Sequence, residues 1–193
     1  MNVAIVLFEG FDELDAVGPY EVFQLAGRYG GDLSAELVTL EQTDRVVARS
    51  GMSVEPHGTL AEANPDLLAV PGGGWNDEGP GVRTEYDRGE IPERIGRQHA
   101  NGVTVASVCT GALLLAKAGL LDGRPATTHH TALEDLGELG VEVRETRVVD
   151  DGDVLTAGGI TSGFDLALHI VVRECGESVA DSVARELEYE RAI

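Results

Sequence analysis

Cys109 stands where a β-forming run of residues meets the start of an apolar, helix-forming stretch. The run Val103–Val108 ends at the cysteine, and small residues lie two positions before and two positions after it, at Ser107 and Gly111. This is the pattern of a nucleophile elbow, in which crowded strand and helix backbones leave room only for small neighbours. The N–H groups at the start of the following helix would favour a thiolate. We therefore expect a nucleophilic cysteine at the carboxyl end of a strand; the alternative is a cysteine that only packs in the core.

Three consecutive glycines, Gly72, Gly73 and Gly74, follow Pro71 at the end of a short apolar run. Glycine lets a backbone approach a ligand closely and point successive N–H groups at one spot. We therefore expect a pocket that stabilises negative charge, in the manner of an oxyanion hole, although a flexible turn has the same sequence. The segment is neither a P-loop nor a complete dinucleotide-binding fingerprint.

Two carboxylates, Asp15 and Glu21, follow the first apolar run and its turn. If that run is a central strand, both carboxylates reach the same crevice as Cys109. A carboxyl group in a desolvated pocket can hold a proton and deliver it to a reacting atom. The sequence thus offers Asp15 as a general acid and Glu21 as a pocket residue. The alternatives are that Asp15 caps the helix and that Glu21 is a solvated acid.

His129 and His130 follow another short β-forming stretch, which ends in two threonines. His129 could orient or deprotonate a group near the sulfur, or it could bind a carbonyl in a structural role. Adjacent histidines point apart, and no spacing of Cys, His or carboxylate residues completes a site, so we expect no bound metal. The second cysteine, Cys175, lies near the end of an apolar helical stretch and is expected only to pack. We expect both cysteines to be free thiols.

Strand-like and helix-like stretches alternate along the chain, which predicts an α/β fold with a mostly parallel sheet between two layers of helices. The expected strands are Asn2–Phe8, Ala35–Leu40, Leu67–Val70, Val103–Val108, Ala126–Thr128, Val141–Val149 and Val154–Ala157, with a hairpin over Val46–Val54. The expected helices are one that begins near Leu14, Ile91–Ala100, Gly111–Ala118, one capped by Thr131, Ser162–Glu174 and Ser178–Tyr189. No repeat or linker divides them, so we expect one domain over residues 1–193.

The charge balance is strongly acidic, with 34 Asp and Glu against 14 Lys and Arg and a net charge of −20. At about 1 M salt the Debye length falls to roughly 3 Å, which screens the self-repulsion of such a surface. We therefore expect a protein of a halophile's cytoplasm, with an ordinary acidic cytosolic enzyme as the alternative. Binding to nucleic acid is disfavoured because phosphate neutralisation needs a basic face. Apolar runs fall far below the roughly 20 residues of a membrane span, and we expect no membrane segment and no signal peptide.

Taken together, these motifs resemble the ThiJ/PfpI superfamily, which shares the flavodoxin-like sandwich of class I glutamine amidotransferase domains. The resemblance covers essentially the whole chain. It is closest to an isonitrile hydratase-like branch, whose pattern is matched by Leu14–Glu21, Val108–Gly111 and Ala126–His129.

The resemblance implies that Cys109 is the nucleophile and that Asp15 and Thr110 are also required. It implies that Gly73 and Gly74 form the pocket beside the sulfur, that the protein is a homodimer with this pocket near the interface, and that no metal or organic cofactor is used. Thr110 replaces the histidine that follows the cysteine in the protease branch, so that Cys-His dyad is absent. We also expect no DNA-binding helix-turn-helix after the last helix.

The leading hypothesis is a cofactor-independent hydratase that acts on a small molecule. The Cys109 thiolate attacks the carbon of an isonitrile, Asp15 protonates the adduct and assists water, and the product is an N-substituted formamide. Thr110 orients water or the intermediate, while N–H groups near Gly73 stabilise charge. One alternative is a glyoxalase or deglycase-like enzyme acting on small carbonyls. The other is a non-catalytic sensor in which Cys109 is reversibly oxidised.

Overall fold

The computed structural model describes residues 1–192, and a seven-stranded sheet lies at its centre. From one edge to the other the strands are β10 (Val148–Asp150), β11 (Val154–Ala157), β7 (Thr104–Ser107), β6 (Leu67–Val70), β1 (Asn2–Val6), β2 (Ser34–Thr39) and β5 (Gly58–Thr59). Every neighbouring pair is parallel except β10 and β11, which are antiparallel. The expected mostly parallel α/β sheet is confirmed.

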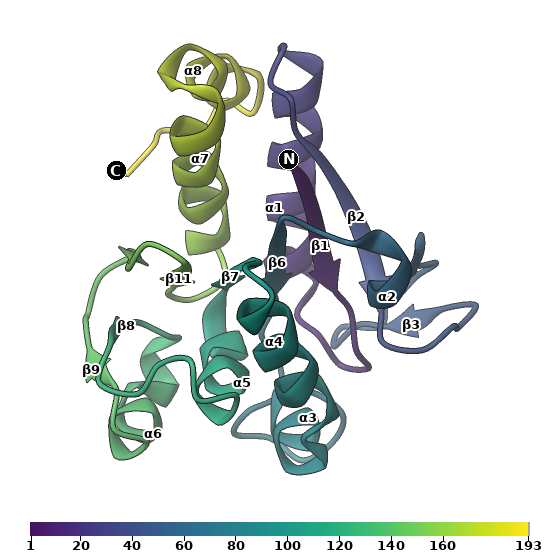
Figure 1. Ribbon diagram of the computed structural model, residues 1–193, viewed down its shortest axis with the longest axis vertical. Helices are drawn as coiled ribbons and strands as arrows, with labels where there is room; N and C mark the ends of the chain where they lie inside the picture. The colour runs from purple at the N-terminus through teal and green to yellow at the C-terminus, as the bar shows by residue number, and fades with distance from the viewer. Residues whose placement is uncertain (193) are drawn as a thin grey trace.

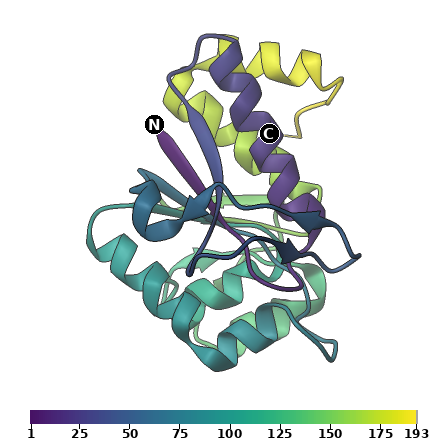
Figure 2. The same cartoon turned by 90° about the vertical axis from the view of Figure 1, so that its right-hand side faces the viewer.

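Helices cover both faces of this sheet, which is why its central strands are almost wholly apolar. All residues of β6 and β11 are buried, as are all of β1 except Asn2. The helices are α1 (Glu13–Arg28), α2 (Leu60–Ala63), α3 (Val82–Arg88), α4 (Glu90–Ala100), α5 (Ala112–Lys117), α6 (Leu133–Glu138), α7 (Ser162–Cys175) and α8 (Glu177–Glu186), with 3-10 turns η1 (Cys109–Gly111) and η2 (His130–Ala132). One layer is formed by α1, α7 and α8, and the opposite layer by α3, α4 and α5 (Figure 1, Figure 2).

The order of the strands determines where a site can form. From β1 the chain adds β2 on one side and later β6, β7 and β11 on the other, so the direction of winding reverses between β1 and β6. In open α/β sheets, ligands bind outside the carboxyl ends of the strands at such a reversal. The loops that follow β1, β6 and β7 therefore converge at one edge of the sheet.

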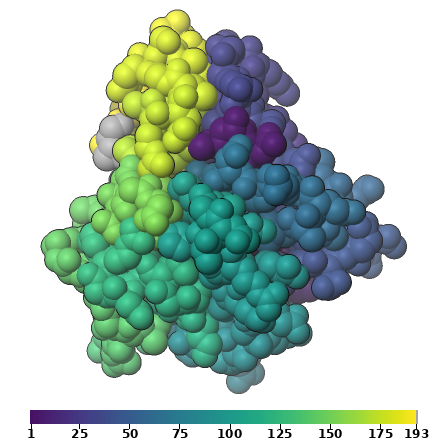
Figure 3. All heavy atoms as spheres, viewed as in Figure 1, coloured from purple at the N-terminus to yellow at the C-terminus, as the bar shows by residue number. Residues whose placement is uncertain are grey.

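Two glycines let α1 and α7 approach each other closely. A Cβ atom added to Gly163 would lie 3.3 Å from Val108 Cγ1 and 3.4 Å from Pro19 Cγ, and one added to Gly18 would lie 3.4 Å from the Phe164 ring. The first and last segments of the chain thus lie against each other at one end of the molecule (Figure 3). This packing joins the helix after β1 to the helix that follows β11.

Several expected elements coincide with the observed ones. The strands β6 and β11 match to the residue, α4 begins one residue earlier than expected, and α7 ends one residue later. The expected hairpin is also confirmed, because β3 (Val46–Val47) and β4 (Ser53–Val54) form an antiparallel pair. These are stretches in which an apolar run, an amphipathic pattern or a turn sequence is sufficient by itself to define the element.

The expected strand Val141–Val149 is wrong. It divides into β9 (Glu142–Val143), which pairs with β8 (Pro125–Ala126) in a small parallel sheet, and β10 in the central sheet. The polar residues 144–147 separate the two halves, because they cannot continue a buried strand. The last helix is also shorter than expected and ends at Glu186.

The expected helix cap at Thr131 is wrong as well. The turn η2 precedes α6, and there the His129 side chain accepts a hydrogen bond from the Thr131 N–H. The short elements α2, α3 and β5 were not expected. Helix α3 lies between Gly81 and Gly89, both with positive φ, so its sequence has the appearance of a loop. Within residues 1–192, no helix combines the length and apolar character needed to cross a membrane.

Candidate active site

Cys109 follows β7 in a strained backbone conformation. Its φ of 57° is left-handed, which non-glycine residues adopt rarely and at an energetic cost. The Cys109 N–H donates to the Gly158 carbonyl at 2.9 Å, and the Cys109 carbonyl accepts from Thr128 Oγ1 at 2.8 Å. A Cβ atom on Gly111 would lie only 2.4 Å from the Val70 carbonyl oxygen, so this position must be glycine. Contacts on both sides hold the turn, and the expected nucleophile elbow is confirmed.

The Cys109 thiol is buried, with 6% of the residue exposed. Burial is the largest influence on the pKa of this thiol, and together with the carboxylates of Asp15 and Asp12 it raises the pKa to about 12. The N–H groups of Thr110 and Ile160 donate toward the sulfur and lower the pKa, but they do not outweigh burial. Burial therefore works against the thiolate that the turn after the strand was expected to favour, and a base beside the sulfur would assist its reaction.

Asp15 is the carboxyl group that lies beside this thiol. Asp15 is 1% exposed, and its Oδ2 accepts a hydrogen bond from the Gly72 N–H at 2.9 Å. Its Oδ1 is buried and accepts no hydrogen bond from an N–H or O–H group of residues 1–192, which leaves the Cys109 thiol as the donor beside it. Burial, with a contribution from the Asp12 carboxylate, raises the pKa of Asp15 to about 7. The helix cap is Asp12, whose Oδ1 accepts from the Leu14 N–H at 3.2 Å, so the capping alternative for Asp15 is wrong.

The glycine run fits tightly against the elbow. A Cβ atom on Gly72 would lie 2.6 Å from the Thr110 nitrogen and 2.8 Å from Cys109 Cβ. Gly73 and Gly74 have φ angles of 123° and 59°, which glycine adopts without strain. The N–H groups of Gly72 and Gly73 are already engaged, because the first donates to Asp15 and the second donates to Thr110 Oγ1 at 3.0 Å. The expectation that N–H groups near Gly73 are open to a ligand therefore holds at most for Gly74, whose N–H has no partner among residues 1–192.

The Thr110 side chain gains a defined orientation from its hydrogen bond with the Gly73 N–H. Its hydroxyl oxygen accepts from the Gly73 N–H, so its own proton is free to donate elsewhere. Thr110 lines the same cavity as Cys109, and the residue is 5% exposed. The hydroxyl can therefore donate to a molecule held against the sulfur.

A cavity of about 320 Å³ opens over the sulfur. The residues that line it are Asp12, Arg49, Gly73, Gly74, Trp75, Asn76, Asp77, Cys109, Thr110, His129, Thr131 and Ile160. Most of these side chains are polar, and Arg49 forms an ion pair with Asp77 across the glycine-rich loop. The cavity is large enough for a small molecule and offers it several hydrogen-bonding groups.

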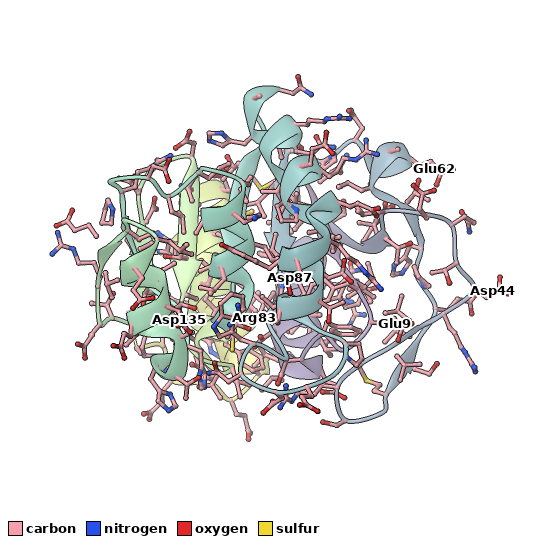
Figure 4. The ribbon with its side chains drawn as sticks, turned by 90° about the horizontal axis from the view of Figure 1, so that it is seen from below. Glu9, Asp44, Glu62, Arg83, Asp87 and Asp135 are labelled. Atoms are coloured by element: carbon pink, nitrogen blue, oxygen red, sulfur yellow. The ribbon has the colours of Figure 1, made fainter. Side chains whose placement is uncertain are left out.

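Trp75 forms a rigid wall of this cavity. Its indole Nε1 donates to Asp135 Oδ2 at 2.5 Å, the Arg83 guanidinium lies 3.8 Å above its ring centroid, and the Tyr86 ring meets it edge-on with centroids 5.3 Å apart. Figure 4 shows Asp135 and Arg83 close together on the underside of the molecule. Three contacts thus fix the indole, and Trp75 limits the size of a bound group.

The structure brings together Asp15, Thr110, the glycines and His129 around Cys109, but it does not bring Glu21 there. Glu21 is exposed on α1 and is absent from the residues that line the cavity. Six residues after Asp15 on a helix, Glu21 points about 120° away from it. Within residues 1–192, no three or more His, Cys, Asp or Glu side chains are grouped so that they could hold a metal ion.

Several residues of the site were not identified from the sequence, among them Asp12, Arg49 and Ile160. Asp12 was detectable, because an Asp just before a helix is a typical N-cap. Arg49 and Ile160 carry no local signal. Arg49 reaches the cavity from the β3–β4 hairpin, and Ile160 is a β-branched residue at a φ of 41°, where its N–H faces the Cys109 sulfur.

Comparison with known proteins agrees with this architecture. The model of the DJ-1/PfpI family matches residues 1–173. The chain is 34% identical to isonitrile hydratase of Pseudomonas putida over 98% of its length and 78% of that protein. It is 31% identical to the HTH-type transcriptional regulator CdhR of Pseudomonas aeruginosa over 94% of this chain, but that match spans 53% of the regulator. A ThiJ/PfpI family protein from Pseudomonas syringae superposes with a TM-score of 0.85 and 26% identity, covering 100% of this chain and 76% of that chain. The protein described here belongs to the DJ-1/PfpI family.

Proposed function

We propose that this protein hydrates isonitriles to N-substituted formamides, with Cys109 as the nucleophile. The observation that carries the proposal is the Asp15 carboxyl group, which is buried beside the Cys109 thiol and has a pKa raised to about 7. A group with this pKa can accept a proton and return it at neutral pH. The similarity to isonitrile hydratase over 98% of the chain supports the same reaction.

The first half of the reaction moves one proton by way of Asp15. As Sγ forms a bond to the isonitrile carbon, the thiol proton passes to the Asp15 carboxylate. Asp15 then delivers this proton to the same carbon, and the product is a thioimidate in which that carbon is bonded to sulfur, nitrogen and hydrogen. The net change is that the sulfur and the hydrogen of the thiol both become bonded to the isonitrile carbon. The step therefore needs no oxidant or reductant.

The second half consumes one water molecule. Water adds to the thioimidate carbon, with one proton going to nitrogen, and Asp15 accepts the other proton from the attacking oxygen. The C–S bond then breaks, the proton returns to sulfur, and the formamide leaves. The Thr110 hydroxyl, which is held by the Gly73 N–H, is placed to orient this water. The N–H groups of Thr110 and Ile160 stabilise the sulfur as it departs with negative charge.

The same thiol and carboxyl pair supports a second candidate, a glyoxalase-like or deglycase-like reaction on small carbonyl compounds. The polar lining of the cavity, which includes Arg49 and Asn76, favours small oxygenated substrates. The third candidate, a redox sensor, would oxidise the same buried thiol, and the raised pKa of Cys109 would slow its direct reaction with peroxides.

The proposal includes one domain over the whole chain and a homodimer. Large apolar side chains are exposed at Val17 on α1, at Met52 in the β3–β4 hairpin and at Ile160 beside the cavity. A hydrogen bond of 2.6 Å from the Ser50 N–H to Glu13 Oε1 joins the hairpin to the start of α1. A dimer that covers the hairpin, the first turns of α1 and the mouth of the cavity would bury these side chains. Sedimentation should show a dimer that Met52→Glu dissociates, whereas Leu139→Glu, at an equally exposed site, should leave it intact.

The direct test is turnover. The protein, in several molar potassium chloride, is incubated with a simple alkyl isonitrile, and formation of the formamide is followed. Turnover in the wild type that is lost in Cys109→Ala supports the proposal. If the wild type is folded and thiol-reactive, leaves the isonitrile unchanged and consumes methylglyoxal, the carbonyl reaction would replace isonitrile hydration as the proposed function.

A further inference from the structure

His129 lies between two cavities. The cavity of about 320 Å³ over Cys109 and a larger one of about 580 Å³ beside it share two lining residues, His129 and Ile160. A molecule attached to Cys109 that extends from the first cavity into the second must pass the imidazole. The reaction steps derived above make no use of this side chain.

The surroundings of His129 favour one tautomer. The Thr131 N–H donates to His129 Nδ1 at 3.4 Å, and Thr131 Oγ1, which can donate or accept, lies 2.9 Å from the same nitrogen. A backbone N–H can only donate, so its contact favours a lone pair on Nδ1, and the neutral ring then carries its proton on Nε2. Burial, and then the repulsion of His130, lower the pKa of His129, which favours the neutral ring; the two rings lie tilted by 40° with centroids 4.2 Å apart.

The edge of the ring that carries Nε2 lies against the segment that binds the sulfur. A Cβ atom on Gly159 would lie 2.5 Å from His129 Cδ2 and 3.2 Å from Nε2, so only glycine leaves room for the ring here. The residues on either side of Gly159 both contact Cys109, through the Gly158 carbonyl and the Ile160 N–H. Nε2 itself has no hydrogen-bond partner among residues 1–192.

We propose that His129 is a catalytic hydrogen-bond donor, which uses its Nε2–H to bind the nitrogen of the thioimidate on Cys109. This inference rests on the proposed function. As water adds to the adduct carbon, electron density moves onto that nitrogen, and a neutral N–H stabilises it without giving up its own proton. His129 is therefore neither the base nor the proton donor of the reaction. Those roles belong to Asp15.

Two substitutions separate this role from a structural one. In His129→Asn, the amide oxygen takes the place of Nδ1 and still accepts from Thr131, since Asn is a good N-cap, but no donor reaches the position of Nε2. In His129→Gln, the amide nitrogen takes the place of Nε2 and the cap is lost. We expect His129→Asn to keep the wild-type thermal midpoint and to lose about 100-fold in kcat with little change in KM. His129→Gln should melt earlier but recover most of the lost kcat.

A merely structural His129 would give the opposite ranking, with His129→Asn active and His129→Gln impaired, and that result would overturn the inference. Mass spectrometry after rapid quenching adds a second readout. The Cys109 adduct should accumulate in His129→Asn, because formation of the thioimidate precedes the step that His129 assists. Loss of adduct formation in that variant would also overturn the inference.

If the proposed function is wrong, neither the wild type nor any variant will turn over the isonitrile, and this outcome differs from every outcome that tests His129 alone. Long-range ¹H–¹⁵N correlation of the imidazole in the free wild type tests the inference without any substrate. An Nε2–H tautomer at neutral pH supports it. An Nδ1–H tautomer or a protonated ring would overturn it, whether or not the protein hydrates isonitriles.

Discussion

The Asp15 carboxyl group is held against the glycines Gly72–Gly74, because its Oδ2 accepts a 2.9 Å hydrogen bond from the Gly72 N–H. This contact joins the first turn of α1, the helix that follows β1, to the loop after β6; β1 and β6 are neighbours in the sheet. A Cβ atom on Gly72 would lie 2.8 Å from Cys109 Cβ, so the same glycine also touches the elbow after β7. Asp15 and Cys109 are thus held on either side of one backbone position.

Asp15→Asn should leave the fold intact and reduce turnover to the level of Cys109→Ala, because an amide cannot carry the proton. In the wild type, kcat/KM should rise with pH through about 7, where Asp15 becomes a carboxylate. The measurement is a pH–rate profile with circular dichroism of both proteins. Full activity in Asp15→Asn would remove this residue from the mechanism.

The same substitution should change how stability depends on pH. The pKa of Asp15 is raised from 3.8 to about 7 on folding, so the folded state favours the protonated acid. This contribution is complete below about pH 4 and is lost as pH rises through 7, and its full size is on the order of 4 kcal/mol. Urea unfolding at pH 5 and pH 8 should therefore show that the free energy of unfolding of Asp15→Asn rises relative to that of the wild type at the higher pH. If the difference between the two proteins is the same at both pH values, the raised pKa is contradicted.

Asp12→Asn should move the rising limb of the pH–rate profile to lower pH. The Asp12 carboxylate raises the pKa of Asp15 and of Cys109, and its removal lowers both. Asn is also a good N-cap, so the start of α1 should remain stable. The matched comparison is Asp32→Asn, which removes one acid away from the cavity and should leave the profile unchanged. Equal profiles for all three proteins would show that Asp12 does not act on the site.

Gly72→Ala should disrupt the site, because the added methyl group would meet the Thr110 nitrogen at 2.6 Å. A shift of the elbow by about 1 Å can cost on the order of 100-fold in rate. The matched control is Gly96→Ala in α4, where the added Cβ meets nothing closer than 3.6 Å. That variant should keep its activity and gain about 0.5–1 kcal/mol, as expected for alanine in a helix. Comparable activity in the two variants would argue against the tight fit.

Alkylation of Cys109 should be slow at neutral pH and accelerate up to at least pH 10, because the pKa of its thiol is raised to about 12. Asp15→Asn removes a carboxylate that raises this pKa, so above pH 7 its Cys109 should react faster. Iodoacetamide kinetics in a Cys175→Ala background would isolate the one thiol. A rate that levels off near pH 7 in the wild type would indicate a resting thiolate instead.

Stability should increase with salt. A net charge of −20 repels itself in the folded state, and screening becomes nearly complete at about 1 M salt. The thermal midpoint should therefore rise between 0.1 M and 2 M potassium chloride and then level off. Sucrose at equal osmolarity, which does not screen charge, serves as the control. A midpoint independent of salt would count against a salt-adapted surface.

The sequence by itself determined the central strands of the sheet and the position of the cysteine. The runs Leu67–Val70 and Val154–Ala157 are strands to the residue, because both faces of a central strand are buried. Their one polar side chain, Thr156, is buried and accepts a hydrogen bond from the Thr127 N–H. Cys109 was recognisable because a tight turn between strand and helix needs small neighbours, and Gly111 meets that need. Such requirements are local, so a short stretch of sequence is enough to reveal them.

Only the tertiary structure decided how these groups behave. The pKa of the Cys109 thiol depends on burial and on carboxylates nearly 100 residues away in sequence. These raise the pKa, whereas the N–H groups of the following turn alone would lower it. Arg49 enters the site from a hairpin and Ile160 from the loop between β11 and α7, and no local pattern marks them. Glu21 points away because of its rotation about α1. Electrostatics and cavity shape are sums over neighbours in space, which the order of residues along the chain does not display.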